Sequence, residues 1–323
     1  MKKVIITLLM ICAAISVKSQ NMKLDPNIKV EVTPDLKMTM GPDFEIDLGA
    51  HIEQAMSSIE GMFGMDFKDK DGKWKDKYQQ DTEELEIPLS KPGEKGKLQV
   101  ESHNGTVKVS AYSGPTVKVK MIKYSKKVER ESGKDGMRLL SSGGFNVQAE
   151  ERNNTVKVET EGWNNRIDFE IQVPANFSLD VQTYNNGAIE IEGVNGEHSI
   201  ESYNGPITLN NVGGSASAST YNGAIKATFN NITANTPMIF TTYNGDVDLT
   251  VPSGTKLSTK MKTFRDIFTD FENFALQKTT PQKSKEGNGY KVKYEDWVEG
   301  KLNGGGAEVT METRNGNIYI RKG

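Results

Sequence analysis

Apolar and polar side chains alternate along this chain from about residue 83 onward, most regularly between residues 184 and 254. In one series of short runs every second residue is apolar, and polar residues such as Glu190, Thr208 and Asp248 stand between them. A period of two residues is typical of a β-strand with one buried face. The apolar positions of this series are Ile189 and Ile191, Ile207 and Leu209, Ile225, Ala227 and Phe229, then Val247, Leu249 and Val251.

A second series of runs lies between the members of the first. Its inward positions are predicted to be Val181 and Thr183, Ile200 and Ser202, Ala216, Ala218 and Thr220, then Met238, Phe240 and Thr242. Each repeat therefore holds two strands. Equivalent positions recur at the repeat spacing, so Ile189, Ile207, Ile225 and Val247 are expected to stack as one ladder.

A Tyr-Asn-Gly turn recurs after every second strand. Its glycines stand at positions 187, 205, 223 and 245, in steps of 18, 18 and 22 residues, and the turn at 187 has one extra Asn. A fixed period of this size indicates a repeat architecture. The turn residues, including those of related turns nearer the chain ends, are Asn104 and Gly105, Asn186 and Gly187, Asn204 and Gly205, Asn222 and Gly223, Asn244 and Gly245, and Asn315 and Gly316.

Two all-β folds fit this pattern. Asn-Gly turns between alternating runs are typical of hairpins and so of an antiparallel meander. A single-stranded parallel β-solenoid (β-helix) would instead place every second turn on one edge, where its chemistry would repeat. Only every second turn is Tyr-Asn-Gly, while the intervening turns vary. We therefore predict the solenoid, with the meander as the alternative.

In the solenoid the tyrosines would form a column along one edge. Its members are Tyr184, Tyr203, Tyr221 and Tyr243. The structural interpretation, which we favour, is that Asn and Gly tolerate the left-handed backbone of the turn and that stacked rings bury area. The functional alternative is an aromatic strip that binds a ligand such as a glycan.

Residues 1–19 have the features of a secretory signal peptide. Lys2 and Lys3 precede an apolar run, and Ser19 provides a small residue at its exit. Cys12 is the only cysteine. Because Ile11 precedes it where a lipoprotein would have a small residue, we assign Cys12 to the signal. Cleavage would remove three lysines and change the formal charge from −3 to −6. No later stretch has the ~18 apolar residues of a spanning helix, so we expect a protein exported to the periplasm, the outer surface or the medium.

Residues 20–82 do not share the repeat and are predicted to be a Met-rich extension. Phe44–Ile46 could form a short strand, and apolar residues at helical spacing between Ile46 and Met65 predict one amphipathic helix. That helix would cap or flank the solenoid, or bind a partner or membrane surface. Residues 67–78 are expected to be a charged linker. They do not form a calcium loop, because Phe67 and Tyr78 occupy ligand positions that need acids.

Residues 83–323 form the predicted repeat domain. A charged, glycine-rich loop is expected at 125–144, and the aromatic segment at 264–274 interrupts the pattern. The final residues restore it around the turn Arg314-Asn315-Gly316. His103 and Arg314 stand where the other turns have Tyr. Terminal coils of a solenoid must meet water, so we expect these two turns to be the outermost.

These stretches resemble a bacterial family of adhesin-like β-strand repeat proteins without assigned function. The similar motifs are LEIPLSKPG, LQVESHNGTVKV, the strand–Asn-Gly–strand units, a VPSG turn and the final GGG followed by TRNGNIYI. They span about Glu83 to Gly323 and exclude the Met-rich extension. The resemblance implies a β-solenoid in an exported protein and provides no catalytic residues.

The residues offer little catalytic chemistry. The three histidines, His51, His103 and His198, have no partners at metal-ligand spacing, so we predict no metal and no cofactor. The pairs Glu190/Glu192 and Asp246/Asp248 lie two residues apart on strands, which places the carboxylates about 7 Å apart. This separation is in the range of glycosidase pairs, but their face is predicted to be solvated.

The composition and the pattern together predict a non-catalytic interaction module of the envelope or cell surface. Its partner would be an envelope protein or a glycan. A mildly acidic balance argues against nucleic acid. The alternative is a carbohydrate-active β-helix enzyme, a lyase or hydrolase that uses surface acids with Lys or Arg.

Overall fold

The computed structural model describes residues 37–39, 45–47, 78–126, 144–163, 165–185, 187–277, 282–286, 289–293 and 297–323. The regular elements among these residues are all β-strands. The chain divides into two compact units, Met1–Ser58 and Ile59–Gly323. In the first unit, β1 (Lys37–Thr39) and β2 (Glu45–Asp47) pair antiparallel.

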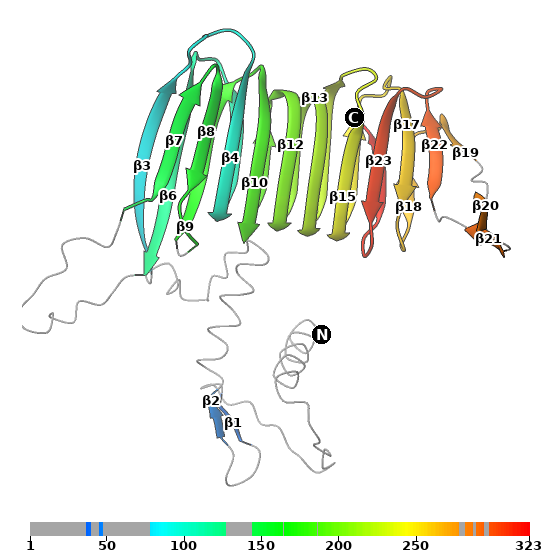
Figure 1. Cartoon of the computed structure of the whole chain (residues 1–323), viewed down its shortest axis with the longest axis horizontal. Helices are drawn as coiled ribbons and strands as arrows, with labels where there is room; N and C mark the ends of the chain where they lie inside the picture. The colour runs from blue at the N-terminus through cyan, green and yellow to red at the C-terminus, as the bar shows by residue number, and fades with distance from the viewer. Residues whose placement is uncertain are drawn as a thin grey trace, which may run out of the picture. The chain divides into compact units, whose positions relative to one another are not determined.

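The second unit consists of coils whose strands lie in two facing layers (Figure 1), called here the first and the second sheet; the long strand β13 contributes to both and joins them into one 20-stranded hydrogen-bonded sheet. The first sheet contains, in spatial order, β7 (Val147–Arg152), β8 (Thr155–Thr160), β4 (Gly96–Asn104), β10 (Phe177–Asn185), β12 (Asn195–Asn204), the end of β13 (Ile207–Asn222), β15 (Met238–Asn244), β23 (Ala307–Thr313), β17 (Leu257–Lys262), β22 (Val298–Leu302) and β19 (Phe274–Gln277).

The second sheet follows the same axis. It contains β3 (Tyr78–Pro88), β6 (Thr116–Lys126), β9 (Arg166–Pro174), β5 (Val107–Tyr112), β11 (Ile189–Glu192), the start of β13, β14 (Ile225–Ile232), β16 (Val247–Val251), β24 (Ile318–Lys322) and β18 (Ile267–Thr269). A separate hairpin joins β20 (Gln282–Glu286) and β21 (Gly289–Lys293).

The predicted stacking of like residues on like is confirmed for the central coils. Ile189 pairs with Ile207, Ile207 with Ile225, and Ile225 with Val247, all in parallel strands. The ladder continues to Val107 on one side and to Ile318 on the other. Because these pairings are parallel and join residues one repeat apart, the meander is wrong for this part of the chain.

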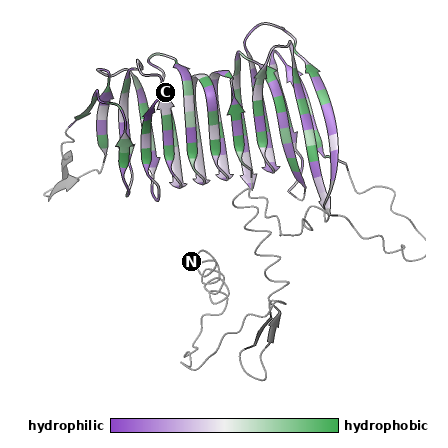
Figure 2. Ribbon diagram, turned by 180° about the vertical axis from the view of Figure 1, so that it is seen from behind, coloured by the Kyte–Doolittle hydropathy of each residue, from purple (hydrophilic) through white to green (hydrophobic). Residues whose placement is uncertain are grey.

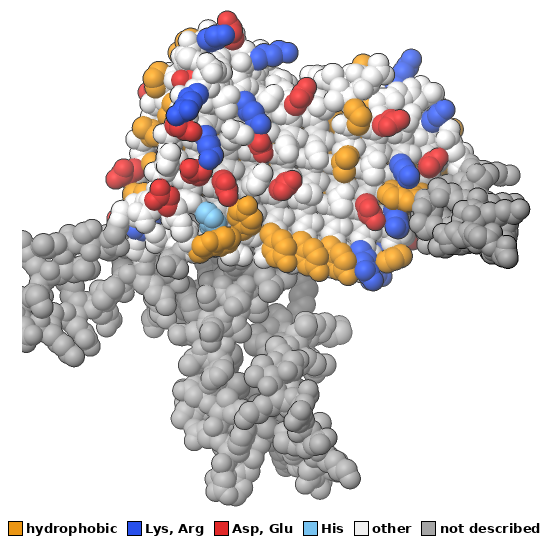
Figure 3. All heavy atoms as spheres, in the orientation of Figure 1, with side chains coloured by type: hydrophobic (Ala, Val, Ile, Leu, Met, Phe, Trp, Pro, Cys, Tyr) orange, Lys and Arg blue, Asp and Glu red, His pale blue; other side chains and the backbone are white. Residues whose placement is uncertain are grey.

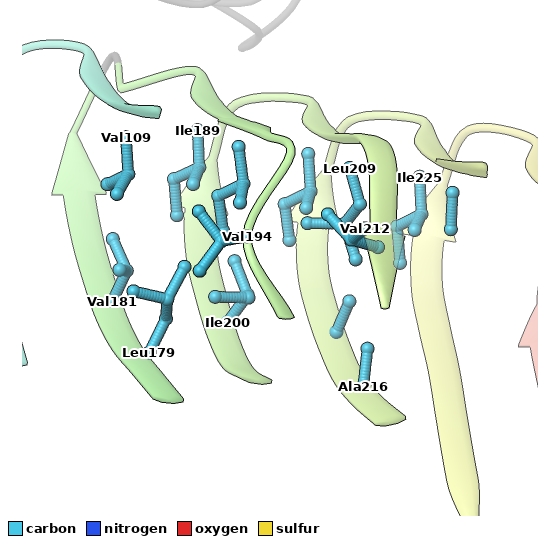
Figure 4. Close-up of a cluster of buried hydrophobic side chains, with 14 of the residues drawn as sticks. Val109, Leu179, Val181, Ile189, Val194, Ile200, Leu209, Val212, Ala216 and Ile225 are labelled. Carbon is cyan, nitrogen blue, oxygen red and sulfur yellow. The ribbon is translucent and has the colours of Figure 1, made fainter. Parts of the chain in front are cut away.

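The core lies between the two sheets. The predicted inward residues of both series are buried, and the polar ones among them, such as Ser202 and Thr220, are no more than 7% exposed. Figure 2 shows the resulting alternation of hydrophobic and hydrophilic positions along the strands. In Figure 4 the buried side chains of successive coils, including Ile189, Ile200 and Ile225, point into the space between the sheets. Each coil therefore buries its apolar faces against its neighbours as well as across the coil.

Antiparallel strands occur at both ends of this stack, where the solenoid prediction was incomplete. At one end β3 pairs with β6, β6 with β9, and β7 with β8; at the other, β22 pairs with β17 and β19. Of these pairs, β7 and β8 form a short hairpin, whereas the members of each other pair are separated in the sequence by further strands. β3 begins at Tyr78, within the predicted linker, because its partner β6 is long enough to pair with its polar first half.

The coils with His103 and Arg314 are not the outermost ones, contrary to the sequence prediction. β4 lies between β8 and β10, and β5 lies between β9 and β11. Likewise β23 lies between β15 and β17, and β24 between β16 and β18. The first and last coils of the sequence are thus inserted into the stack and protected on both sides.

Several predictions concern residues outside the described ranges. The signal peptide, the amphipathic helix after Ile46 and the loop after Lys126 lie there, except that Glu45–Asp47 is a strand, close to the one predicted at Phe44–Ile46. In the described part of the chain, no helix has the length and hydropathy needed to span a membrane.

Candidate binding groove

The Tyr-Asn-Gly turns stack along one edge of the first sheet, as the repeat predicts. Asn204, Asn222 and Asn244 align in the parallel register. Their side-chain amides form a ladder: Asn222 Nδ2 donates to Asn204 Oδ1 (2.8 Å), Asn244 to Asn222 (2.7 Å) and Asn315 to Asn244 (2.7 Å). Each amide therefore links two coils. Asn186 lies outside the described residues, and it is Asn185 that aligns with Asn104.

The predicted left-handed backbone is found at only some of these turns. Gly105 and Gly245 have positive φ (129° and 149°), whereas Gly205, Gly223 and the asparagines of the turns at 204, 222 and 244 do not. Instead, a Cβ on Gly223 would lie well under 3.0 Å from the carbonyl oxygen of Gly205, and similar clashes recur along the stack. Glycine is required because successive turns approach backbone to backbone, and Asn because its amide bridges the coils.

Buried hydroxyls complete the turn. Thr220 Oγ1 donates to the Gly205 carbonyl (2.9 Å), and Thr242 Oγ1 to the Gly223 carbonyl (2.8 Å). Thr313 and Gly245 repeat the contact at 2.7 Å. A buried carbonyl without a partner costs free energy, so these hydroxyls explain why polar residues alternate with apolar ones inside this edge.

The tyrosines lie outside this hydroxyl layer and form part of a longer row. The rings of Tyr203 and Tyr221 stack at 5.5 Å between centroids with 8° between planes, and those of Tyr221 and Tyr243 at 4.9 Å and 13°. Arg314 follows, with its guanidinium 5.2 Å from the Tyr243 ring and 5.6 Å from that of Phe264. Arg314, which follows β23 on the inserted coil, thus extends the row with a cation that lies between two aromatic rings.

At the other end of the row, beyond a break in the stacking, Tyr184 contacts His103 and Trp163. Its ring stacks with that of His103 at 5.7 Å and meets the edge of Trp163 at 5.5 Å. The His103 Nδ1 lies 2.8 Å from Thr160 Oγ1. Asn104 donates its side-chain amide to the Trp163 carbonyl. Figure 3 shows the hydrophobic side chains along one edge of this face, with basic side chains near one end.

Phe264 and Trp163 are members of the row that the sequence pattern did not identify. Both lie outside the Tyr-Asn-Gly repeats, Phe264 after β17 and Trp163 after β8. They reach the edge because β17 pairs in register with β23 and β8 with β4. The aromatic composition of residues 264–274 was the available signal for Phe264.

A groove of about 660 Å³ runs along the row, in the size range of ligand sites. One side is formed by the aromatic side chains of Tyr184, Tyr203, Tyr221, Tyr243 and Phe264, together with Arg314. The other side is formed by outward side chains that stand two residues before the members of the first side in the sequence. They are Gln182, Glu201, Ser219, Thr241, Glu312 and Lys262. Lys262 Nζ lies 3.6 Å from a Glu312 carboxylate oxygen. Two acids and two bases therefore line the groove, and its formal charge is balanced.

The acid pairs singled out in the sequence lie on the second sheet, away from this groove. Glu190 forms an ion pair with Lys108 at 3.1 Å, and Asp248 one with Arg321 at 2.8 Å. The Asp248 carboxylate raises the pKa of Arg321 through a hydrogen bond. Asp246 accepts the Asn317 backbone N–H at 2.7 Å. These carboxylates connect neighbouring coils.

His198 is buried in the core, which the sequence did not predict. It is 3% exposed, its Nε2 lies 3.3 Å from the Val194 carbonyl, and its Nδ1 has no hydrogen-bond partner among the residues that the structure describes. Burial lowers its pKa. His198 is therefore neutral in the folded protein at neutral pH. Among the described residues, no three His, Cys, Asp or Glu side chains are placed to hold a metal ion together.

A family model described as Toastrack DUF4097 matches residues 15–321. The chain belongs to this family. The match begins well before Glu83 and includes the whole of the Met-rich extension at residues 20–82, so the expectation that the extension lies outside the family pattern was wrong. The family resemblance expected from the strand–Asn-Gly–strand units is thereby confirmed, and the Toastrack DUF4097 chain has the β-solenoid-like fold seen here.

Two solved structures are similar to this Toastrack chain at low identity. One is a proposed cell adhesion protein from Clostridium sporogenes, with 13% identity, a TM-score of 0.39, and coverage of 76% of this chain and 100% of the other. The second is a proposed adhesin from Bacteroides fragilis, with 10% identity, a TM-score of 0.33, and coverage of 76% and 97%. Among curated proteins, none matches the chain.

Proposed function

We propose that this protein is an exported, non-catalytic interaction module of the cell envelope or surface, and that the groove along the aromatic row is its binding surface. The groove carries the proposal. It extends across strands from β10 to β17, and its aromatic wall is partly exposed although rings of this size are normally buried. Aromatic side chains with polar neighbours are typical of binding surfaces.

Export is proposed from the features of residues 1–19 and an interaction role from the shape of the repeat domain. The names of the two similar structures agree with that role but add no argument at their TM-scores. The partner is an envelope component that lies along the groove.

The groove carboxylates support a binding role over catalysis. Glu201 and Glu312 are separated by the coils of Ser219 and Thr241, so three strand spacings of about 4.8 Å place their Cα atoms about 14 Å apart. Lys262, with which Glu312 pairs, lies on the next coil, on the side away from Glu201. Glycosidase pairs lie within about 5–9.5 Å. Glu312 is also neutralised by Lys262. We therefore propose binding rather than the carbohydrate-active alternative.

The test uses two photo-crosslinking positions on one strand. Ser219 lines the groove near the end of β13, whereas Thr208 faces solvent from the second sheet near its start. The unnatural amino acid p-benzoylphenylalanine is placed at 219 or at 208 in the native cell, and envelope fractions are examined after irradiation.

The expected result is a discrete crosslinked envelope product from position 219 and none from 208, with the protein in an exported fraction. A protein retained in the cytoplasm would contradict the proposal. So would equal products from both positions, or no product from position 219.

A further inference from the structure

The aromatic row is interrupted at one step. Tyr184 and Tyr203 lie on adjacent coils, since Thr183 pairs with Ser202 in the parallel register. Their rings nevertheless do not stack: Tyr184 turns to His103 and Trp163, whereas Tyr203 stacks on Tyr221. Within the described residues, one face of the Tyr203 ring therefore has no aromatic neighbour.

Tyr203 is also the most exposed of the row's tyrosines, at 56%. The ring face left without an aromatic neighbour therefore belongs to the tyrosine of the row with the largest exposed fraction.

The open ring face differs chemically from the rest of the row. Tyr221 and Tyr243 have rings or a guanidinium on both faces, so they present only ring edges and hydroxyls to the groove. The face of an aromatic ring carries negative potential and an apolar surface. A ligand that packs on Tyr203 must therefore be flat on one side and present C–H groups there.

The polar side chains near Tyr203 restrict the chemical class of the ligand further. Gln182 offers donors and an acceptor, and Glu201 offers acceptors, at the positions next to Tyr184 and Tyr203. Farther along, Ser219 and Thr241 add hydroxyls that both donate and accept. The balanced charge of the groove disfavours a strongly anionic or cationic chain. Hydroxyl groups on an uncharged chain match this lining.

We infer that the gap between Tyr184 and Tyr203 is a subsite for one sugar ring of a neutral linear saccharide. The C–H face of the ring packs on Tyr203, and the chain continues along the groove past Ser219 and Thr241. This inference rests on the proposed binding role of the groove and specifies its ligand class.

The test is binding of the full chain to a panel of soluble oligosaccharides, measured by isothermal titration calorimetry. The neutral probes are hexamers of β-1,4-glucose, β-1,4-N-acetylglucosamine, β-1,4-mannose and β-1,4-xylose, and the charged probe is a hexamer of galacturonate. At least one neutral hexamer is expected to bind, and the galacturonate hexamer is expected to bind more weakly.

Three substitutions assign the binding to the subsite. Tyr203→Ala is expected to lower the affinity for the bound hexamer at least tenfold, because it removes the ring face on which the sugar packs. Tyr203→Phe keeps the ring face and should stay within about threefold of the original affinity. Tyr319→Ala, which removes an aromatic ring stacked on Phe268 outside the groove, should have no effect. If the alanine variant does not fold, Tyr203→Leu replaces it, since Leu is apolar but has no flat face.

Three results would overturn the inference: no neutral hexamer binds, the Tyr203→Ala or Tyr203→Leu variant binds as well as the original, or only galacturonate binds. Failure here is distinct from failure of the proposed function. Crosslinking from position 219 to an envelope component, without saccharide binding, would retain the interaction role and reject the sugar.

Discussion

At the scale of single residues, close backbone approach explains the glycines of the repeat turn more completely than backbone conformation does, because only Gly105 and Gly245 among them have positive φ. Gly187, Gly205, Gly223, Gly245 and Gly316 each lie where a Cβ would collide with the turn of a neighbouring coil. The Asn-Gly motif could be found in the sequence. The reason for it could not, because a hairpin and a stacked turn use the same residues for different purposes.

Replacing one of these glycines should destabilise the fold strongly. Gly223→Ala forces the Gly205 and Gly223 turns apart, and we expect a loss of about 2–4 kcal/mol in the free energy of unfolding, as for other overpacked sites. Urea denaturation followed by circular dichroism measures it. Gly254→Ala is the matched control: its Cβ meets nothing within 4 Å and its φ is ordinary. Equal losses for both variants would show that coil contact is not the reason for Gly223.

His198 should make stability depend on pH. Its parallel partners on the adjacent coils are Leu179 and Ala216, and burial lowers its pKa. The folded state therefore binds fewer protons than the unfolded state, and stability falls as pH drops below the ordinary value of about 6.5. Unfolding at pH 7.5 and 5.5 measures the change. His198→Met, which fills the space without titrating, should lose less stability between these two pH values. An equal loss would exclude His198 as the cause.

At the scale of elements, the strands and their inward faces could be predicted from the alternation alone. A residue such as Ile207 is buried because its strand has one face in the core, and period two identifies that face. The members of the aromatic row could be predicted only in part. Phe264 and Trp163 join it through the pairing of β17 with β23 and of β8 with β4, and no repeat in the sequence encodes those pairings.

Substitutions on the two faces of a strand should differ in their effect on the free energy of unfolding, because only one face carries the buried apolar ladder. Ile225 is 1% exposed, so Ile225→Ala should cost about 2–5 kcal/mol of unfolding free energy. Glu190→Ala, on the solvated face of the same sheet, should cost less than about 1 kcal/mol, because its ion pair with Lys108 is exposed. Chemical denaturation compares them. A loss at Glu190 as large as that at Ile225 would contradict the assigned faces.

At the scale of the whole repeat domain, sequence order and spatial order differ. The coil of β4 and β5 comes first in the domain, and that of β23 and β24 comes last, yet each lies between two other coils. The sequence could not predict this, because each inserted coil has the same pattern as its neighbours. The expectation that terminal coils lie outermost failed for that reason.

This topology predicts the effect of a deletion. Removing residues 307–323 takes away a coil that pairs with β15 and β16 on one side and with β17 and β18 on the other. We expect loss of cooperative folding, seen as a broad thermal transition by circular dichroism. In a stack ordered like the sequence, the deletion would remove one end coil and leave a cooperative transition, and that outcome would contradict the insertion.

The parallel register of like on like is the claim on which the groove, the row and the core all depend. Cysteines at Thr208 and Lys226, which pair directly in adjacent coils with outward side chains, test it most directly in a Cys12→Ser background. Cα atoms of neighbouring strands, about 4.8 Å apart, are within disulfide reach. Mild oxidation should therefore join 208 to 226 and leave a 208/248 pair, two coils apart, unjoined. No disulfide between 208 and 226, or one between 208 and 248, would contradict the stacked-coil structure.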